Sequence, residues 1–98
     1  MSVPLSVLDV VPVRNGATVK DAFDESIALA QHTEKLGYRR YWFAEHHGAA
    51  GIASAAPAVL AARIASATTT IRVGSGGVML PNHAALTIAE QFGTLEAL

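Results

Sequence analysis

The strongest constraint on the fold is a threefold alternation of strand-like and helix-like segments along the 98 residues. Apolar runs rich in β-branched or aromatic residues at 3–11, 38–44 and 71–80 predict strands, and a segment with helical periodicity follows each. Successive strands begin a little over thirty residues apart, which is the length of a right-handed βαβ crossover unit. The order βαβαβα therefore predicts an α/β fold with a parallel sheet.

Local signals set the expected helix ends. Thr18 and Asp21 approximate a capping box that opens the first helix, and Gly37 supplies a left-handed stop. Ser54 or a neighbour is expected to cap the second helix, with Pro57 in its first turn, and the third begins near residue 84. The expected buried stripes are Ala22, Phe23, Ile27, Ala30 and Leu36, then Val59, Leu60, Ile64 and Ala67, then Ala85, Ile88, Ala89, Phe92 and Leu95.

The same period suits a (β/α)8 TIM-type barrel of about 250 residues, of which this chain would hold about three of eight units. The last helix reaches Leu98 without a glycine, asparagine or basic residue to satisfy its final carbonyls. Residues 1–98 are therefore expected to be the truncated N-terminal segment of a single barrel domain. The alternative is an open three-stranded sheet that covers its edges by self-association.

Composition excludes several classes of protein. Hydrophobic residues make up 51% of the chain and charged residues 15%, which argues against disorder. The formal charge of -1 argues against a nucleic-acid-binding or membrane-binding face, and the absence of cysteine excludes disulfides, zinc-thiolate sites and thiol nucleophiles. No apolar run approaches the roughly 20 residues of a membrane span and no signal-peptide pattern opens the chain, so a cytoplasmic location is expected.

Polar residues follow the first two strands, at Asp9 and at Glu45-His46-His47. Because ligands of parallel α/β proteins gather at the carboxyl ends of strands, these residues should share one rim. Successive strand residues point to opposite faces, so one histidine is expected to be catalytic and the other structural. The alternative is that backbone carbonyls satisfy both imidazoles.

A metal site is a weaker hypothesis for the same rim. It would recruit His46, His83 and either Glu45 or Asp9 as ligands. No His-x-His or His-x-x-x-His spacing is present, so three separate loops would have to converge. The metal-free site is preferred.

Glycines interrupt the third strand at Gly74, Gly76 and Gly77, with Ser75 between them. Glycine weakens a strand interior, so its presence indicates a close approach by another group, or alternatively a bulge. Leu80 stands where a Gly-x-Gly-x-x-Gly dinucleotide motif would need glycine, so a planar ligand is favoured over a pyrophosphate.

The second helix, residues 54–68, contains seven alanines on all sides and little charge beyond Arg63. Helix propensity alone could explain this composition. A small, apolar surface is also suited to a partner subunit, and a dimer interface is the preferred interpretation.

Three motifs taken together carry a family resemblance: AEHH at 44–47, RVGSGGVMLPNH at 72–83 and AEQ at 89–91. They resemble the N-terminal part of the bacterial luciferase-like, flavin-dependent monooxygenase family, and the similarity covers essentially the whole chain. The resemblance implies a (β/α)8 barrel that uses reduced FMN, usually supplied by a separate flavin reductase, and dioxygen to oxidise an aldehyde, alkane or similar small organic substrate. Phosphate-binding residues and most of the substrate pocket lie beyond residue 98 in family members, so this chain alone is expected to bind flavin poorly and to be inactive.

The resemblance also assigns roles by position. His46 matches the active-site histidine, the candidate base, and Gly76-Gly77 matches a non-proline cis peptide against the flavin ring. Glu45 and Ser75 are taken as further cofactor-binding residues. The family dimerises through its second and third helices, here 54–68 and 84–98, where we expect His47 to pair with a carboxylate such as Glu90.

Three other functions remain open from the sequence. One is a non-catalytic, truncated dimerisation or ligand-binding module. Another is a deazaflavin-dependent dehydrogenase of the same superfamily, which would transfer hydride without oxygen chemistry. The third and weakest is a metal-dependent barrel hydrolase.

Overall fold

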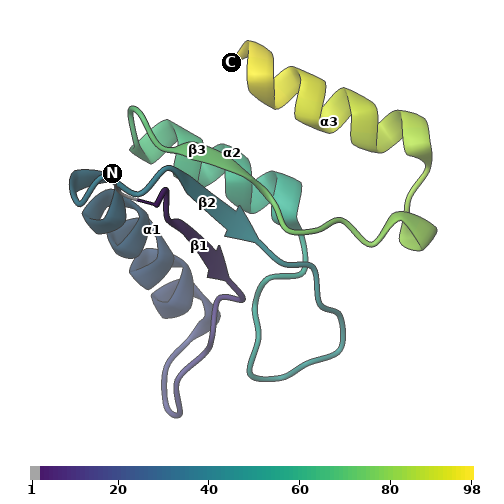
Figure 1. The fold of residues 1–98 in the computed structure, drawn as a ribbon. Helices are drawn as coiled ribbons and strands as arrows, with labels where there is room; N and C mark the ends of the chain where they lie inside the picture. The colour runs from purple at the N-terminus through teal and green to yellow at the C-terminus, as the bar shows by residue number, and fades with distance from the viewer. Residues whose placement is uncertain (1–2) are drawn as a thin grey trace.

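The computed structural model describes residues 3–98 as a parallel sheet with helices between its strands (Figure 1). The three strands pair in the order β1-β2-β3, each parallel to its neighbour. This arrangement confirms the predicted α/β fold and its βαβαβα order. The elements are β1 (Ser6–Asp9), α1 (Val19–Lys35), β2 (Arg40–Phe43), α2 (Pro57–Ala67), β3 (Arg72–Ser75), the short 3-10 helix η1 (Leu80–Asn82) and α3 (Ala85–Ala97).

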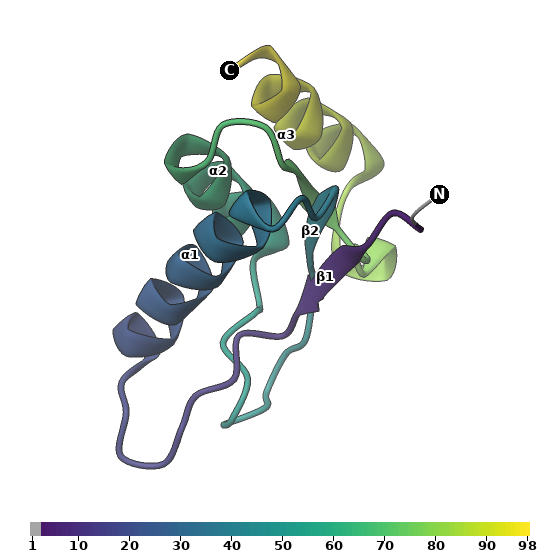
Figure 2. The same cartoon turned by 60° about the vertical axis from the view of Figure 1, so that its left-hand side comes forward.

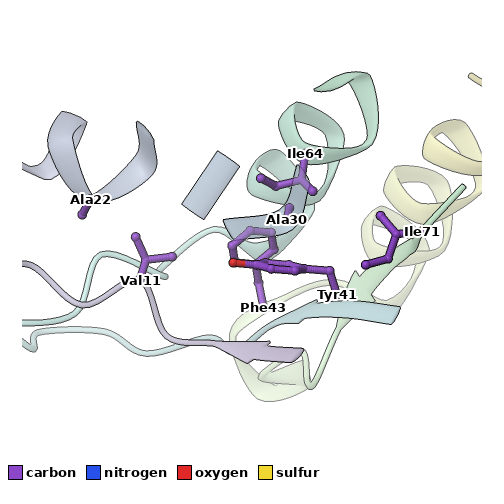
Figure 3. Packing of buried hydrophobic residues seen from close by; sticks show 7 residues of the cluster. All are labelled: Val11, Ala22, Ala30, Tyr41, Phe43, Ile64 and Ile71. Atoms are coloured by element: carbon purple, nitrogen blue, oxygen red, sulfur yellow. The ribbon is translucent and has the colours of Figure 1, made fainter. Parts of the chain in front are cut away.

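Helices α1 and α2 lie on one side of the sheet, and the hydrophobic core lies between them and the strands (Figure 2). Tyr41 and Phe43 of β2 are fully buried in this core, where they pack with Ile64 of α2 (Figure 3). Strand side chains alternate between the faces, so Trp42 and its register partner Leu8 lie on the other face. They are 39% and 58% exposed, so the second face of the sheet is uncovered.

All three strands are shorter than predicted, and β2 spans Arg40–Phe43 instead of residues 38–44. The first ends at Asp9 because its carboxylate accepts a 2.6 Å hydrogen bond from the Val11 amide, and Val11 adopts a left-handed φ of 53°. The third ends at Ser75 instead of continuing to residue 80, and the Gly76–Gly77 peptide that follows is cis. The chain then passes through η1 to α3. Asp9, Gly74 and Ser75 therefore lie at the strand ends, and Gly76, Gly77 and Glu45 to His47 lie in the loops just beyond them.

The predicted helix signals are confirmed for α1 and partly wrong for α2. The Thr18 hydroxyl accepts a 3.0 Å hydrogen bond from the Asp21 amide, Asp21 caps Thr18 in return, and Gly37 has a φ of 86°. Pro57 opens α2 as expected, but no side chain caps this helix. The Ser54 hydroxyl instead donates to the carbonyl of Ala44, at the end of β2.

The predicted buried stripes are correct in their middles, but Leu36, Val59, Ala85 and Ala89 are exposed. The buried residues of α2 are Pro57, Ala61 and Ile64, a helical spacing that leaves Val59 on another side and 69% exposed. Leu36 is 62% exposed because it is the residue that caps the end of α1. Helix α3 buries no residue, although Ile88, Phe92 and Leu95 are half-buried. No helix among residues 3–98 is long and apolar enough to cross a membrane.

A single carboxylate ties the end of α1 to the start of β3. Glu34 accepts hydrogen bonds from the backbone amides of Thr69, Thr70 and Ile71 at 2.8, 2.6 and 2.9 Å. The amides of Ile71 and Thr70 lower the pKa of Glu34 to about 2. The ionised Glu34 side chain thus holds residues 69–71 in place directly before β3. These hydrogen bonds help to set the position of the strand that leads to the glycines.

Candidate functional site

The three strands end at one edge of the sheet. Asp9, Phe43 and Ser75 are the last residues of their strands and lie in register across the sheet. The segments that continue from them are 10–13, 44–47 and 76–83. The polar and glycine-rich segments are therefore brought to one rim, as parallel topology predicts.

The glycine segment, residues 74–77, packs closely on the uncovered face of β2. The Gly76 amide donates a 2.8 Å hydrogen bond to the Phe43 carbonyl. A Cβ atom at Gly76 would lie 2.9 Å from Cε3 of Trp42 and 3.4 Å from Cδ1 of Leu8, so only glycine fits there. A Cβ at Gly77 would meet nothing within 4 Å. The backbone therefore packs against the Trp42 ring at Gly76, whereas the space beside Gly77 is unoccupied among the described residues.

The two histidines have different environments. His47 Nε2 lies 2.6 Å from Oε2 of Glu45. His46 is exposed, its side chain has no hydrogen-bond partner among residues 3–98, and its amide donates to the Ser54 carbonyl at 2.8 Å. Among these residues, backbone carbonyls satisfy neither imidazole, and His46 is the histidine whose ring is free to meet a ligand.

Glu45 is the centre of a polar cluster that also contains His47, Met79 and His83. Its side chain is fully buried, and besides His47 it is bonded to His83 Nε2 at 3.0 Å and to the Met79 amide at 3.1 Å. Burial raises the pKa of Glu45, but the hydrogen bonds from His47, Met79 and His83 outweigh it and lower the pKa to about 2. Glu45 is therefore an ionised carboxylate. The metal hypothesis grouped His83 with Glu45 at this rim, but sequence reasoning missed the direct hydrogen bond between them.

Asp9 and Ser75 direct their side chains to the protein. Asp9 is buried and accepts hydrogen bonds from the Val11 amide, the Ser26 hydroxyl and the Tyr41 hydroxyl at 2.6, 2.6 and 2.5 Å. The Ser75 hydroxyl donates to the Phe43 carbonyl at 3.3 Å. Glu45, His47 and His83 are bonded to one another, and within residues 3–98 no group of three histidine or acidic side chains is arranged to hold a metal ion.

Glu90 lies away from this rim, on α3. It is exposed and lines a groove of about 600 Å³ between α2 and α3, beside Ala58 and Ala62. Within one chain His47 is bonded to Glu45 and not to Glu90. The expected pairing of His47 with Glu90 requires a second copy of the chain and stays a prediction.

Comparisons with known proteins agree on one family. The family model described as luciferase-like monooxygenase matches residues 1–98. A luciferase-like monooxygenase of Escherichia coli (strain K12) is 55% identical over 97 residues, which cover 99% of this chain and 29% of that protein. The crystal structure of apo-MsnO8 superposes with a TM-score of 0.95 at 48% identity, covering 98% of this chain and 29% of that one.

A more distant structure shows the same fold. It is the oxygenating constituent of 3,6-diketocamphane monooxygenase from Pseudomonas putida, a type II Baeyer–Villiger monooxygenase in complex with FMN. Its TM-score is 0.87 at 21% identity, over 96% of this chain and 26% of that one. The chain thus spans less than a third of the length of the proteins that it matches.

Proposed function

The chain belongs to the luciferase-like monooxygenase family and matches the start of its TIM barrel, and we propose that it builds one side of a flavin site. The complete site would use reduced FMN and dioxygen to oxidise a small organic substrate such as an aldehyde or alkane. The observation that carries this proposal is the glycine segment, which offers bare backbone at the same carboxyl-end rim as the exposed His46. The FMN complex of the Pseudomonas putida relative supports the choice of cofactor.

The residues at the rim fit a flat ring. Gly76 is held against Trp42 and Gly77 is unobstructed, so no side chain of the glycine segment stands in the way of an isoalloxazine. We assign Gly76, Gly77 and the neighbouring Ser75 to the cofactor site, and Glu45 to its support. When bound, reduced FMN would supply the electrons that activate dioxygen. His46 would move a proton at its free imidazole, the commonest general base in enzymes.

A chimera tests this function, because residues 1–98 align with 97 residues of the Escherichia coli relative and can replace them. We expect the chimera to bind FMN. His46→Ala should leave FMN affinity within about threefold but slow the reoxidation of bound reduced FMN by roughly 10²-fold or more, the usual contribution of a general base. Fluorescence titration measures binding, and stopped-flow absorbance measures reoxidation.

His32→Ala is the matched control, since His32 is an exposed histidine of α1 outside the rim. Reoxidation at the unmodified rate in His46→Ala would remove His46 from the mechanism. A chimera that binds no FMN but still dimerises would favour the non-catalytic module. Binding of a deazaflavin in preference to FMN, with no oxygen uptake during turnover, would favour the dehydrogenase. The separate reductase and the cytoplasmic location stay predictions.

We also propose a homodimer through the faces of α2 and α3. Helix α3 buries none of its residues, and the groove between it and α2 is lined by Ala58, Ala62 and Leu95 together with polar residues such as Glu90. An exposed apolar surface beside polar residues is typical of a protein–protein interaction site. His47 would donate to Glu90 of the second copy through Nδ1, the ring nitrogen that Glu45 does not use, and this pairing requires an imidazole protonated on both nitrogens.

His47→Ala should weaken the dimer about tenfold, because it removes one charged partner at the interface while leaving the alanine surface intact. Sedimentation equilibrium at a series of concentrations measures the dissociation constant, with His32→Ala again as control. An unchanged dissociation constant would rule out the pairing with Glu90, and a chain that stays monomeric at every concentration would rule out the dimer.

A further inference from the structure

We propose that Glu45 is a positioning residue, a buried carboxylate that anchors segment 77–83 to the end of β2 and sets which nitrogen of His47 and His83 carries the proton. The effect of Glu45 on FMN binding depends on the function proposed above. Its effects on segment 77–83 and on the two histidine rings do not.

Glu45 has no oxygen left for a cofactor. Its Oε1 lies 3.1 Å from both the Met79 amide and His83 Nε2, and its Oε2 lies 2.6 Å from His47 Nε2 and 3.0 Å from His83 Nε2. The side chain is fully buried. Glu45 can therefore act on a ligand at the rim only through the groups that it holds.

Two anchors from the same strand end hold the glycine segment, one on each side. Upstream, the Phe43 carbonyl accepts the Gly76 amide at 2.8 Å, and downstream the Glu45 carboxylate accepts the Met79 amide. Gly76 and Gly77 lie between the anchors. Glycine has the greatest backbone freedom of any residue, so the path of this segment depends on its anchors more than it would with larger residues.

The same carboxylate selects the tautomers of two imidazoles. An ionised carboxylate can accept hydrogen bonds but cannot donate them, so the nitrogens that face it must carry hydrogen. Glu45 is ionised at neutral pH, since its pKa is lowered to about 2 in spite of its burial. His47 and His83 are both bonded through Nε2, so each neutral ring leaves Nδ1 as its acceptor. Glu45 thereby determines which nitrogen of each ring can accept a hydrogen bond from another group.

Glu45→Gln tests both effects in this chain, because the amide keeps the shape of the side chain but loses its charge and half of its acceptors. We expect hydrogen exchange of the Met79 amide to speed up at least about tenfold, the effect of losing one hydrogen bond to a charged group. Nitrogen-15 spectra of the rings should change from a single Nε2–H form of His47 and His83 to a mixture of tautomers. Glu96→Gln makes the same change of charge at an exposed site of α3 and should alter neither measurement.

His83 provides a second pair of variants if Glu45→Gln does not fold. His83→Gln retains a side-chain N–H for Glu45 and should keep the slow exchange of Met79, whereas His83→Phe removes that N–H and should speed the exchange. Equal exchange rates in these two variants would overturn the anchoring role. A folded Glu45→Gln variant with unchanged Met79 exchange and unchanged tautomers would overturn the proposal as a whole.

In the chimera, Glu45→Gln should weaken FMN binding about tenfold relative to Glu96→Gln, by loosening the segment that borders the ring. FMN affinity equal to that of Glu96→Gln would refute the link from Glu45 to the cofactor site. If the unmodified chimera bound no FMN, the proposed function would fail, while the exchange and tautomer measurements would still decide the role of Glu45.

Discussion

Replacing Gly76 with alanine is expected to destabilise the protein by about 1–3 kcal/mol and to abolish measurable FMN binding by the chimera. The added Cβ would lie 2.9 Å from the Trp42 indole, closer than packed atoms allow, and 3.4 Å from Leu8. Either the ring or the glycine segment must move, and the segment is the part that borders the proposed flavin. Denaturant unfolding measures the stability, and Trp42 fluorescence reports the displaced ring, since Trp42 is the protein's one tryptophan.

Two variants separate the clash from a general intolerance of alanine. Gly93→Ala adds a methyl group to α3 where nothing lies within 4 Å, so it should be neutral or stabilise the helix by up to about 1 kcal/mol. Trp42→Leu should partly restore stability when it is combined with Gly76→Ala, because it removes the ring that the new Cβ meets. A Gly76→Ala protein with the unfolding midpoint and tryptophan emission of the parent would contradict the predicted clash.

Replacing Asp9 with alanine is expected to cost about 3–5 kcal/mol, because it leaves three buried donors without an acceptor and each such donor costs about 1–3 kcal/mol. The change leaves the Tyr41 hydroxyl, the Ser26 hydroxyl and the Val11 amide without their acceptor. Burial and the hydrogen bond to Asp9 raise the pKa of Tyr41, so its hydroxyl stays protonated and must donate elsewhere. Because domains of this size have about 5–15 kcal/mol of stability in total, the change should remove a large share of the free energy of unfolding.

Tyr41→Phe removes one donor and keeps the carboxylate, so we expect a smaller loss of about 1 kcal/mol. Asp24→Ala removes an exposed carboxylate that pairs with Lys20 and should cost less than about 1 kcal/mol. Urea unfolding followed by circular dichroism gives all three values. An Asp9→Ala midpoint no lower than that of Asp24→Ala would show that the Asp9 network contributes little.

Much of the fold could be predicted because periodicity and spacing depend on residues that are close in the chain. The strand order, the capping box at Thr18 and the stop at Gly37 all follow from local patterns. The end of β1 could not be predicted, since it depends on Asp9 bonding to the Val11 amide in preference to continuing the strand. Ser54 was misinterpreted for a similar reason, because its hydroxyl prefers the Ala44 carbonyl to a helix end.

The candidate site was predictable in place but not in detail. The glycines indicated a close approach, yet the group that approaches Gly76 is the protein's own Trp42, which becomes apparent only when strand register is known. The contact between Glu45 and His83 joins residues 38 apart in the chain, and no short motif encodes it. The metal hypothesis brought Glu45 and His83 to one rim, but the direct hydrogen bond between them could not be predicted.

The side chains on the uncovered face of the sheet change from charged to apolar along the strands. Near the strand starts, Arg40 and Arg72 lie side by side in register, and neither has a salt-bridge partner within residues 3–98. Two residues further on, Leu8 and Trp42 form an apolar step that leads to the glycines. Neighbouring guanidinium groups repel each other. A surface that packs against this face should therefore place hydrogen-bond acceptors or negative charge beside Arg40 and Arg72, and apolar groups beside Leu8 and Trp42. Such a face would receive a complementary inner surface in only one orientation along the strands.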